Sequence, residues 1–180
     1  MPFVQTLWQR ALDPEMKFTD FALRQLALFC AAAEVETDRA RIVWAEPSAK
    51  LAKQIFAATE EAQLDIKVSN RQQELGSRLT ELGVKWEMES CPFEKHYGNM
   101  LSIDLKFERK NGQMVALEFN GPSHYVKEVG TDIEEENGRT KFKRRILTKM
   151  GYELVMINWR EWKSDAELDL EFLRNRLKLD

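Results

Sequence analysis

The 180-residue chain has few of the residues that build metal-bound or disulfide-linked domains. It contains two histidines and two cysteines, Cys30 and Cys91, which lie far apart and match no metal-ligand spacing. The cysteine pattern therefore argues against a zinc module and against a disulfide scaffold. The two thiols fit a reducing compartment.

Long apolar runs and a positive net charge are also missing. No apolar stretch approaches the ~20 residues that a membrane span needs, so we expect no membrane partner. The formal net charge of −3 argues against a coat on nucleic acid through bulk charge, but it leaves room for a local basic patch. The first residues show no Arg-rich, acid-poor leader, because Asp13 and Glu15 follow closely. Either no transit peptide exists, or Met1 begins a mature or recombinant fragment.

The chain is 43% hydrophobic and 32% charged, which is enough for a packed core. Residues 1–68 have helical periodicity, with Thr19 and Ser48 as predicted N-caps of the second and third helices. We therefore predict an α-helical segment over 1–68, similar to a helical-repeat region, and a second domain over 69–180.

Residues 69–180 alternate between helical and strand patterns. A helix capped at Ser69 or Asn70 ends at Gly83, and a polar loop containing Glu134–Glu136 precedes a helix whose inner face is Phe142, Ile146 and Met150. The strands are predicted at 84–89, 101–109, 114–120 and 153–158, and the last helix at 165–179. This order predicts an α/β fold, a mixed four-stranded sheet flanked by helices.

The turn between the second and third strands fixes their register. A two-residue Asn111-Gly112 loop would mix the apolar and polar faces of the two strands. A three-residue Lys110–Gly112 loop, with Gly112 left-handed in a G1 bulge, keeps the apolar residues on one face. It also places Asp104 opposite Glu118, with Asn120 beside them.

Two facing carboxylates destabilise a sheet unless something neutralises them. One interpretation is a divalent metal, such as Mg²⁺, held by Asp104 and Glu118. The other is compensation by Lys106 on the same face in a solvated network. His124 lies just beyond the strand and is either a member of this site or a structural turn residue.

The densest positive cluster of the chain lies in the predicted helix after the polar loop. Its helix N-terminus at Thr140 offers backbone N–H groups for a phosphate, and Tyr125 is a candidate for stacking on an unpaired base. The alternative is a solvated face neutralised by the neighbouring Glu134–Glu136. The cluster comprises Arg139, Lys141, Lys143, Arg144, Arg145 and Lys149.

These motifs resemble the RAP domain, a small RNA-binding domain abundant in apicomplexan proteins and also found at the carboxyl end of organellar helical-repeat proteins. The resemblance covers roughly residues 69–162. It rests on Asp104, the segment Glu118–His124 (EFNGPSH), residues 138–147 (GRTKFKRRIL), Gly151-Tyr152 and the closing Trp159–Trp162.

The resemblance implies an organellar RNA-binding protein, by analogy mitochondrial. It would act in rRNA or mRNA processing or as a component of the mitochondrial ribosome, with RNA and other organellar proteins as partners. RNA would contact His124, Tyr125 and the basic helix, from Arg139 and Thr140 to Lys149.

The RAP domain is in turn similar to the restriction-endonuclease-like fold of very-short-patch repair nucleases. That likeness makes Asp104 and Glu118 the metal-binding acids and puts Asn120 where those nucleases have a lysine or an aspartate. Lys106 or Lys141 are candidate substitutes for the lysine. Two alternatives therefore remain open beside RNA binding: a Mg²⁺-dependent endonuclease, and a non-catalytic protein-interaction module in a large assembly.

Overall fold

The computed structural model describes residues 2–13, 15–36, 47–63, 68–98, 100–127, 129–130 and 134–179. The chain divides into two compact units. One comprises residues 1–66 with 93–101, and the other comprises residues 67–92 with 102–180. Within the described residues, no helix is both long and apolar enough to span a membrane.

The first unit is helical. It contains α1 (Pro2–Ala11), α2 (Asp20–Glu36), α3 (Ala49–Gln63) and the short α5 (Glu94–Tyr97). Thr19 and Ser48 act as the predicted caps, because their side-chain oxygens accept the N–H groups of Ala22 and Leu51. The sequence predicts only a loop around α5, but the loop packs on α3, where the Thr59 hydroxyl donates to the Tyr97 carbonyl at 2.7 Å.

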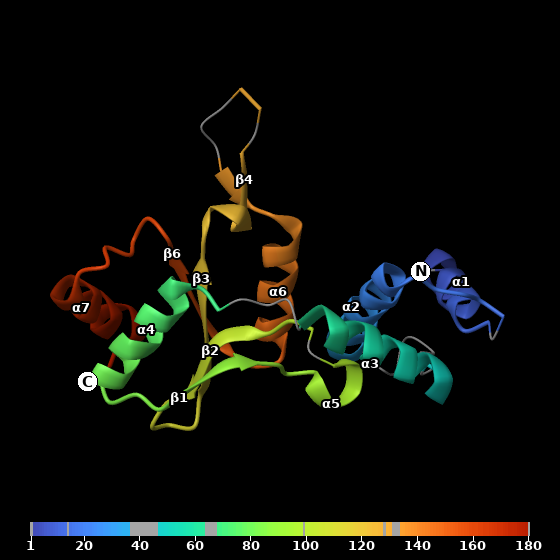
Figure 1. Ribbon diagram of the computed structural model, residues 1–180, viewed down its shortest axis with the longest axis horizontal. Helices are drawn as coiled ribbons and strands as arrows, with labels where there is room; N and C mark the ends of the chain where they lie inside the picture. Colours follow the sequence, from blue (N-terminus) through green and yellow to red (C-terminus); the bar gives the residue numbers. More distant parts are fainter. Residues whose placement is uncertain are drawn as a thin grey trace. The chain divides into compact units, whose positions relative to one another are not determined.

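The second unit is an α/β sandwich, which confirms the predicted fold class. Its sheet has the order β1-β2-β3-β6, with β3 and β6 parallel and the other neighbours antiparallel. The strands are β1 (Trp86–Ser90), β2 (Ile103–Glu108), β3 (Met114–Asn120) and β6 (Glu153–Asn158). The helices α4 (Asn70–Glu81) and α7 (Ala166–Leu177) cover one face, and α6 (Gly138–Lys149) covers the other (Figure 1).

The face under α4 and α7 holds the main core. Leu75 and Leu79 of α4 and Leu173 and Leu177 of α7 are fully buried against the sheet. Trp162 joins them, with its ring edge-on to those of Phe119 and Phe172. The face under α6 is less apolar, with a small cluster of Ile103, Ala116 and Leu147. Polar groups are therefore concentrated between α6 and the sheet.

The hairpin between β2 and β3 has the predicted register. Leu105 pairs with Leu117 and Glu108 with Met114. Gly112 has a φ of +85° and closes the Lys110–Gly112 loop. Glycine adopts that left-handed backbone without steric cost, which is why the bulge forms here.

Two features of this unit differ from the sequence-based prediction. The polar loop contains a two-stranded antiparallel sheet, β4 (Tyr125–Lys127) and β5 (Glu134–Glu136), preceded by the 3-10 turn Pro122–His124. The inner face of α6 is formed by Thr140, Ile146 and Leu147, whereas Phe142 and Met150 are only half-buried. The helix is thus rotated relative to the predicted apolar stripe.

Candidate functional site

The two acids predicted to face each other lie side by side where β2 and β3 separate. Asp104 and Glu118 are 9% and 2% exposed. The Asp104 carboxylate accepts the backbone N–H of Phe119 at 2.8 Å, and a Glu118 carboxylate oxygen lies 3.4 Å from the backbone nitrogen of Asp104. The side chains of Asp104 and Glu118 therefore link β2 and β3 where the two backbones no longer bond to each other.

Lys143 supplies the positive charge for this pair. Its ammonium donates to the second carboxylate oxygen of Glu118, and its side chain is 19% exposed. Burial raises the pKa of Glu118 above its ordinary value and the Asp104 charge adds to this, whereas Lys143 opposes it. Neither predicted substitute lysine reaches the acids: Lys106 pairs with Glu87 and Lys141 with Glu135, each at 2.7 Å.

Asn120 lies two residues beyond Glu118 on the same strand and is 1% exposed. Its side-chain nitrogen has no hydrogen-bond partner among the described residues. An amide N–H group is a donor, so this unpartnered group suits an acceptor oxygen and cannot ligate a cation.

The site fits a resident divalent metal poorly. The part of the chain that the structure describes holds no group of three or more His, Cys, Asp or Glu side chains placed to bind one. One carboxylate oxygen of Glu118 already accepts from the ammonium of Lys143, and the other faces the backbone N–H of Asp104. Metal-dependent chemistry at Asp104 and Glu118 therefore has no ligand set in this conformation.

A polar corner joins the carboxyl end of β3 to the start of α6. The Asn137 side chain caps α6 by accepting the Thr140 N–H at 2.9 Å, and it donates to the Ser123 carbonyl at 2.7 Å. The ring nitrogen Nδ1 of His124 lies 3.2 Å from the Thr140 hydroxyl. Burial lowers the pKa of His124, which favours its neutral form. The side chain of Thr140 is buried, so this corner positions α6 on the sheet.

Tyr125, predicted as a stacking residue, begins β4 and is half-buried. Its hydroxyl accepts from the Asn158 side chain at 2.9 Å. Asn158 ends β6 and pairs with Asn120 at the end of β3. Trp159 follows directly, is 38% exposed, and has the Arg160 guanidinium 4.7 Å from its ring centre. Aromatic rings thus gather at the carboxyl ends of the two parallel strands.

The other basic residues of α6 are exposed: Arg139, Lys141, Arg144, Arg145 and Lys149. Two of them form ion pairs with β5, Lys141 with Glu135 at 2.7 Å and Arg144 with Glu136 at 3.1 Å. The third acid, Glu134, pairs with Arg160 at 2.7 Å. The strand β5 is therefore an acidic strand that partly neutralises this basic surface.

These exposed ion pairs hold the cations in place without removing them from solvent. The side chains of Lys141 and Arg144 are 49% and 51% exposed. Exposed pairs of this kind contribute little to stability, so a phosphate group can replace the carboxylate. Sequence reasoning found both charge runs. It missed Asn137, Arg160 and the inward position of Lys143, because strand pairing and helix rotation decide these.

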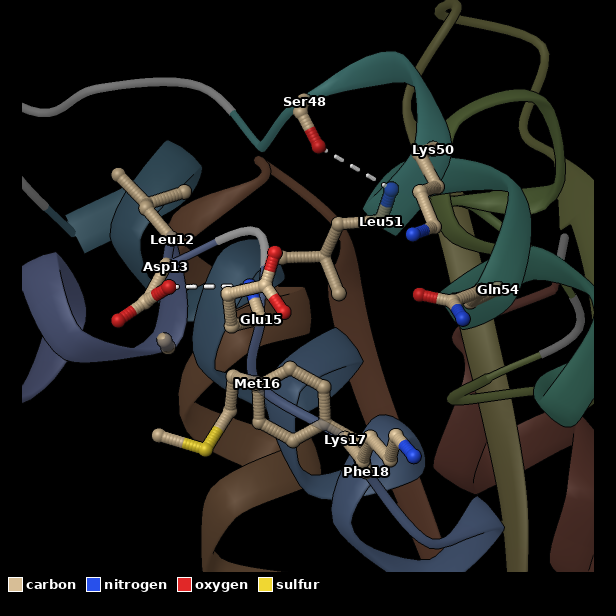
Figure 2. Close-up of a pocket in the computed structure, with 11 residues that line it drawn as sticks. Leu12, Asp13, Glu15, Met16, Lys17, Phe18, Ser48, Lys50, Leu51 and Gln54 are labelled. Carbon is tan, nitrogen blue, oxygen red and sulfur yellow. Dashed lines mark hydrogen bonds between the residues drawn. The ribbon is translucent and has the colours of Figure 1, made fainter.

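A hollow lies within the helical unit. Its volume is about 490 Å³, and its wall includes Asp13, Lys17, Phe18, Lys50 and Gln54. Figure 2 shows Ser48 and Asp13 turned to backbone N–H groups of their own neighbours, at Leu51 and Glu15. The hollow mixes charges of both signs with apolar side chains and indicates no particular ligand.

Comparison with known proteins supports the resemblance found in the sequence. The family model of the RAP domain matches residues 117–176, which include the second half of β3, the polar corner, α6, β6 and most of α7. A "RAP domain-containing protein, chloroplastic" from Oryza sativa subsp. japonica is 32% identical over 114 residues. The match covers 62% of this chain and 16% of that relative.

The resemblance to the RAP domain is thus confirmed over residues 117–176. No solved structure matches the chain, so the likeness to restriction-endonuclease-like enzymes stays a prediction.

Proposed function

We propose that this chain binds RNA, with the exposed cations of α6 holding the phosphate backbone and the His124–Tyr125 rim lying beside the bases. The RAP-domain match supports the class of partner. The observation that carries the proposal is the basic surface of α6, where five exposed cations lie on one helix. Asn137 bonds the start of this helix to the turn after β3, and Lys143 bonds it to the sheet.

The electrostatics explain how an acidic chain can bind a polyanion. Binding to nucleic acid gains free energy from the counterions that local Lys and Arg side chains release, and it does not require a positive net charge. The acids of β5 lower the potential at this surface, and the rest of the chain repels phosphate. A narrow footprint of a few nucleotides is the expected result.

We also propose an organelle as the place of action, with rRNA or mRNA maturation or a place in the ribosome as the task. The name of the rice relative supports a plastid for that protein, whereas the sequence resemblance favours the mitochondrion for this one. Protease protection of the endogenous protein in purified mitochondria and plastids distinguishes the two.

The direct test of RNA binding uses charge reversal on the outer face of α6. Arg139→Glu/Arg145→Glu should weaken binding of a single-stranded RNA about 100-fold or more at 50 mM salt, because two phosphate contacts become repulsive. Arg174→Glu/Lys163→Glu makes the same change of charge on α7 and in the loop before it. This variant should leave the affinity within roughly threefold. Lys143 is unsuitable for this test, since its loss leaves the buried carboxyl group of Glu118 without its partner and so changes the site itself.

The same samples test the two other functions. Incubation of labelled RNA and DNA with Mg²⁺ should give no cleavage, and cleavage that Asp104→Ala abolishes would replace the proposal by an endonuclease. Equal RNA affinity of the two double variants, or none in the unaltered chain, would leave the protein-interaction module.

A further inference from the structure

The cation beside the Asp104–Glu118 pair is a side chain of the protein itself, the ammonium of Lys143. We propose that the Lys143 ammonium takes the place of a divalent metal between α6 and the sheet, and that it keeps metal ions out of this site. The inference concerns the acid pair alone and does not depend on RNA binding.

The position of Lys143 in its helix is the first support. Thr140, Lys143 and Leu147 are spaced three and four residues apart, so they lie on one side of α6. Thr140 and Leu147 are buried on that side, and Lys143 is carried inward with them. The lysine is therefore fixed by helix phase, unlike Lys141 and Arg144, whose side chains are about half exposed.

The hydrogen bonds of the two carboxylates are the second support for the inference. Donors of the protein already bind the oxygens that face α6 and the ends of the strands. One oxygen of Asp104 accepts the Phe119 N–H, and the two oxygens of Glu118 face the Asp104 N–H and the Lys143 ammonium. Mg²⁺ and Mn²⁺ need several oxygen ligands in a nearly octahedral arrangement. A metal held by both acids at the face toward α6 would have to displace Lys143 from Glu118.

The surrounding charges agree with one resident cation. Glu89 lies close enough on β1 to interact electrostatically with both Asp104 and Lys143, and His124 faces the same groups from the polar corner. Burial disfavours the charged form of both residues. Lys143 is then the principal positive charge that compensates the acid pair.

The inference predicts that removing one ammonium creates a metal site. Lys143→Met keeps most of the side-chain volume and leaves the two acids without a cation. In EDTA this variant of the whole chain should melt about 5 °C lower, because the buried carboxyl group of Glu118 loses its hydrogen-bond donor. With MnCl2 as the probe, it should bind Mn²⁺ saturably and regain at least roughly 5 °C.

Two controls separate this effect from general metal binding. Lys141→Met removes an exposed ion pair from the same helix and should bind no more Mn²⁺ than the unaltered chain. Adding Asp104→Asn to Lys143→Met should abolish the acquired Mn²⁺ binding, which would show that the acid pair holds the ion. The unaltered chain should show no saturable binding and no shift in melting temperature up to about 1 mM Mn²⁺.

Two results would overturn the inference: saturable Mn²⁺ binding by the unaltered chain that Asp104→Asn removes, or a folded Lys143→Met variant that binds no Mn²⁺. If Lys143→Met does not fold, the amide NMR signals of the unaltered chain in the presence of Mn²⁺ test the inference instead. Selective broadening of the Asp104 and Phe119 signals by Mn²⁺ contradicts the inference, and their persistence supports it.

Discussion

At the scale of single residues, helix phase divides neighbouring cations into two roles. Lys141 and Lys143 are two positions apart in a run of basic residues, yet Lys141 pairs with an exposed acid and Lys143 with a buried one. The sequence shows the charge of both. The direction in which each points depends on which side of α6 packs on the sheet.

The titration of Glu118 gives a prediction about pH. Burial raises its pKa from 4.5 to about 8, with Asp104 adding to the shift and Lys143 opposing it. Between these values the folded chain retains a proton that the unfolded chain loses. The contribution of Glu118 to the free energy of unfolding is therefore complete below about pH 4.5 and is lost as the pH rises toward 8.

Chemical denaturation of the unaltered chain and of Glu118→Gln, at steps between pH 5 and pH 8.5, measures this effect. The free energy of unfolding should fall with rising pH in the unaltered chain, and the fall should be smaller in the variant, which has no carboxyl group to titrate. Parallel pH profiles of the two proteins would contradict the assignment.

Gly76 tests the packing of α4 on β1. A Cβ atom at this position would lie 2.6 and 2.7 Å from two ring carbons of Trp86. Gly76→Ala should therefore cost about 1–3 kcal/mol, although alanine favours a helix. Gly138→Ala is the control, since an added Cβ atom there would meet no described residue within 4 Å beyond its chain neighbours and its own helix. Urea unfolding of both variants measures the difference, and equal stability would show that Trp86 tolerates the methyl group.

At the scale of elements, the acidic strand β5 restrains the basic surface of α6. Its three consecutive glutamates have little preference for a strand, so the sequence predicts a polar loop. Pairing with Tyr125–Lys127 and ion pairs to Lys141, Arg144 and Arg160 give them an ordered place. Contacts across the chain, which local sequence does not contain, decide this element.

Neutralising this strand should strengthen RNA binding. Glu134→Gln/Glu135→Gln removes two carboxylates that compete with phosphate for Arg160 and Lys141. We expect roughly two- to tenfold tighter binding at low salt, with little change in folding stability, because exposed pairs contribute little. Glu167→Gln/Glu171→Gln on α7 is the control of equal charge. Weaker binding by the β5 variant in a fluorescence anisotropy titration would show that these acids do not face the RNA.

At the scale of the whole molecule, the sequence predicts the α/β unit well and the grouping of segments less well. The residue ranges of β3 and β6 and the register of the hairpin follow from alternation and from the Asn111-Gly112 turn. The sequence also indicates that Asp104 and Glu118 meet. It does not indicate that residues 93–101, which lie between β1 and β2 along the chain, belong to the helical unit.

The sequence predicts those site residues whose positions follow from the alternation along a strand. It does not predict those whose positions depend on how the helices pack. Asp104, Glu118 and Asn120 follow from one register. Lys143 requires the rotation of α6, and the buried polar groups of the sheet face set that rotation. The RAP-domain motifs predict the class of partner, since several of them occur in order along the chain.

The salt dependence of RNA binding tests the central claim most directly. If the five exposed cations of α6 contact phosphates, the affinity for a single-stranded RNA should fall with salt, with a slope of log K against log salt near −3.5. The slope should become less steep by about 1.4 in Arg139→Glu/Arg145→Glu. A slope near zero, or one that this double variant leaves unchanged, would contradict the account.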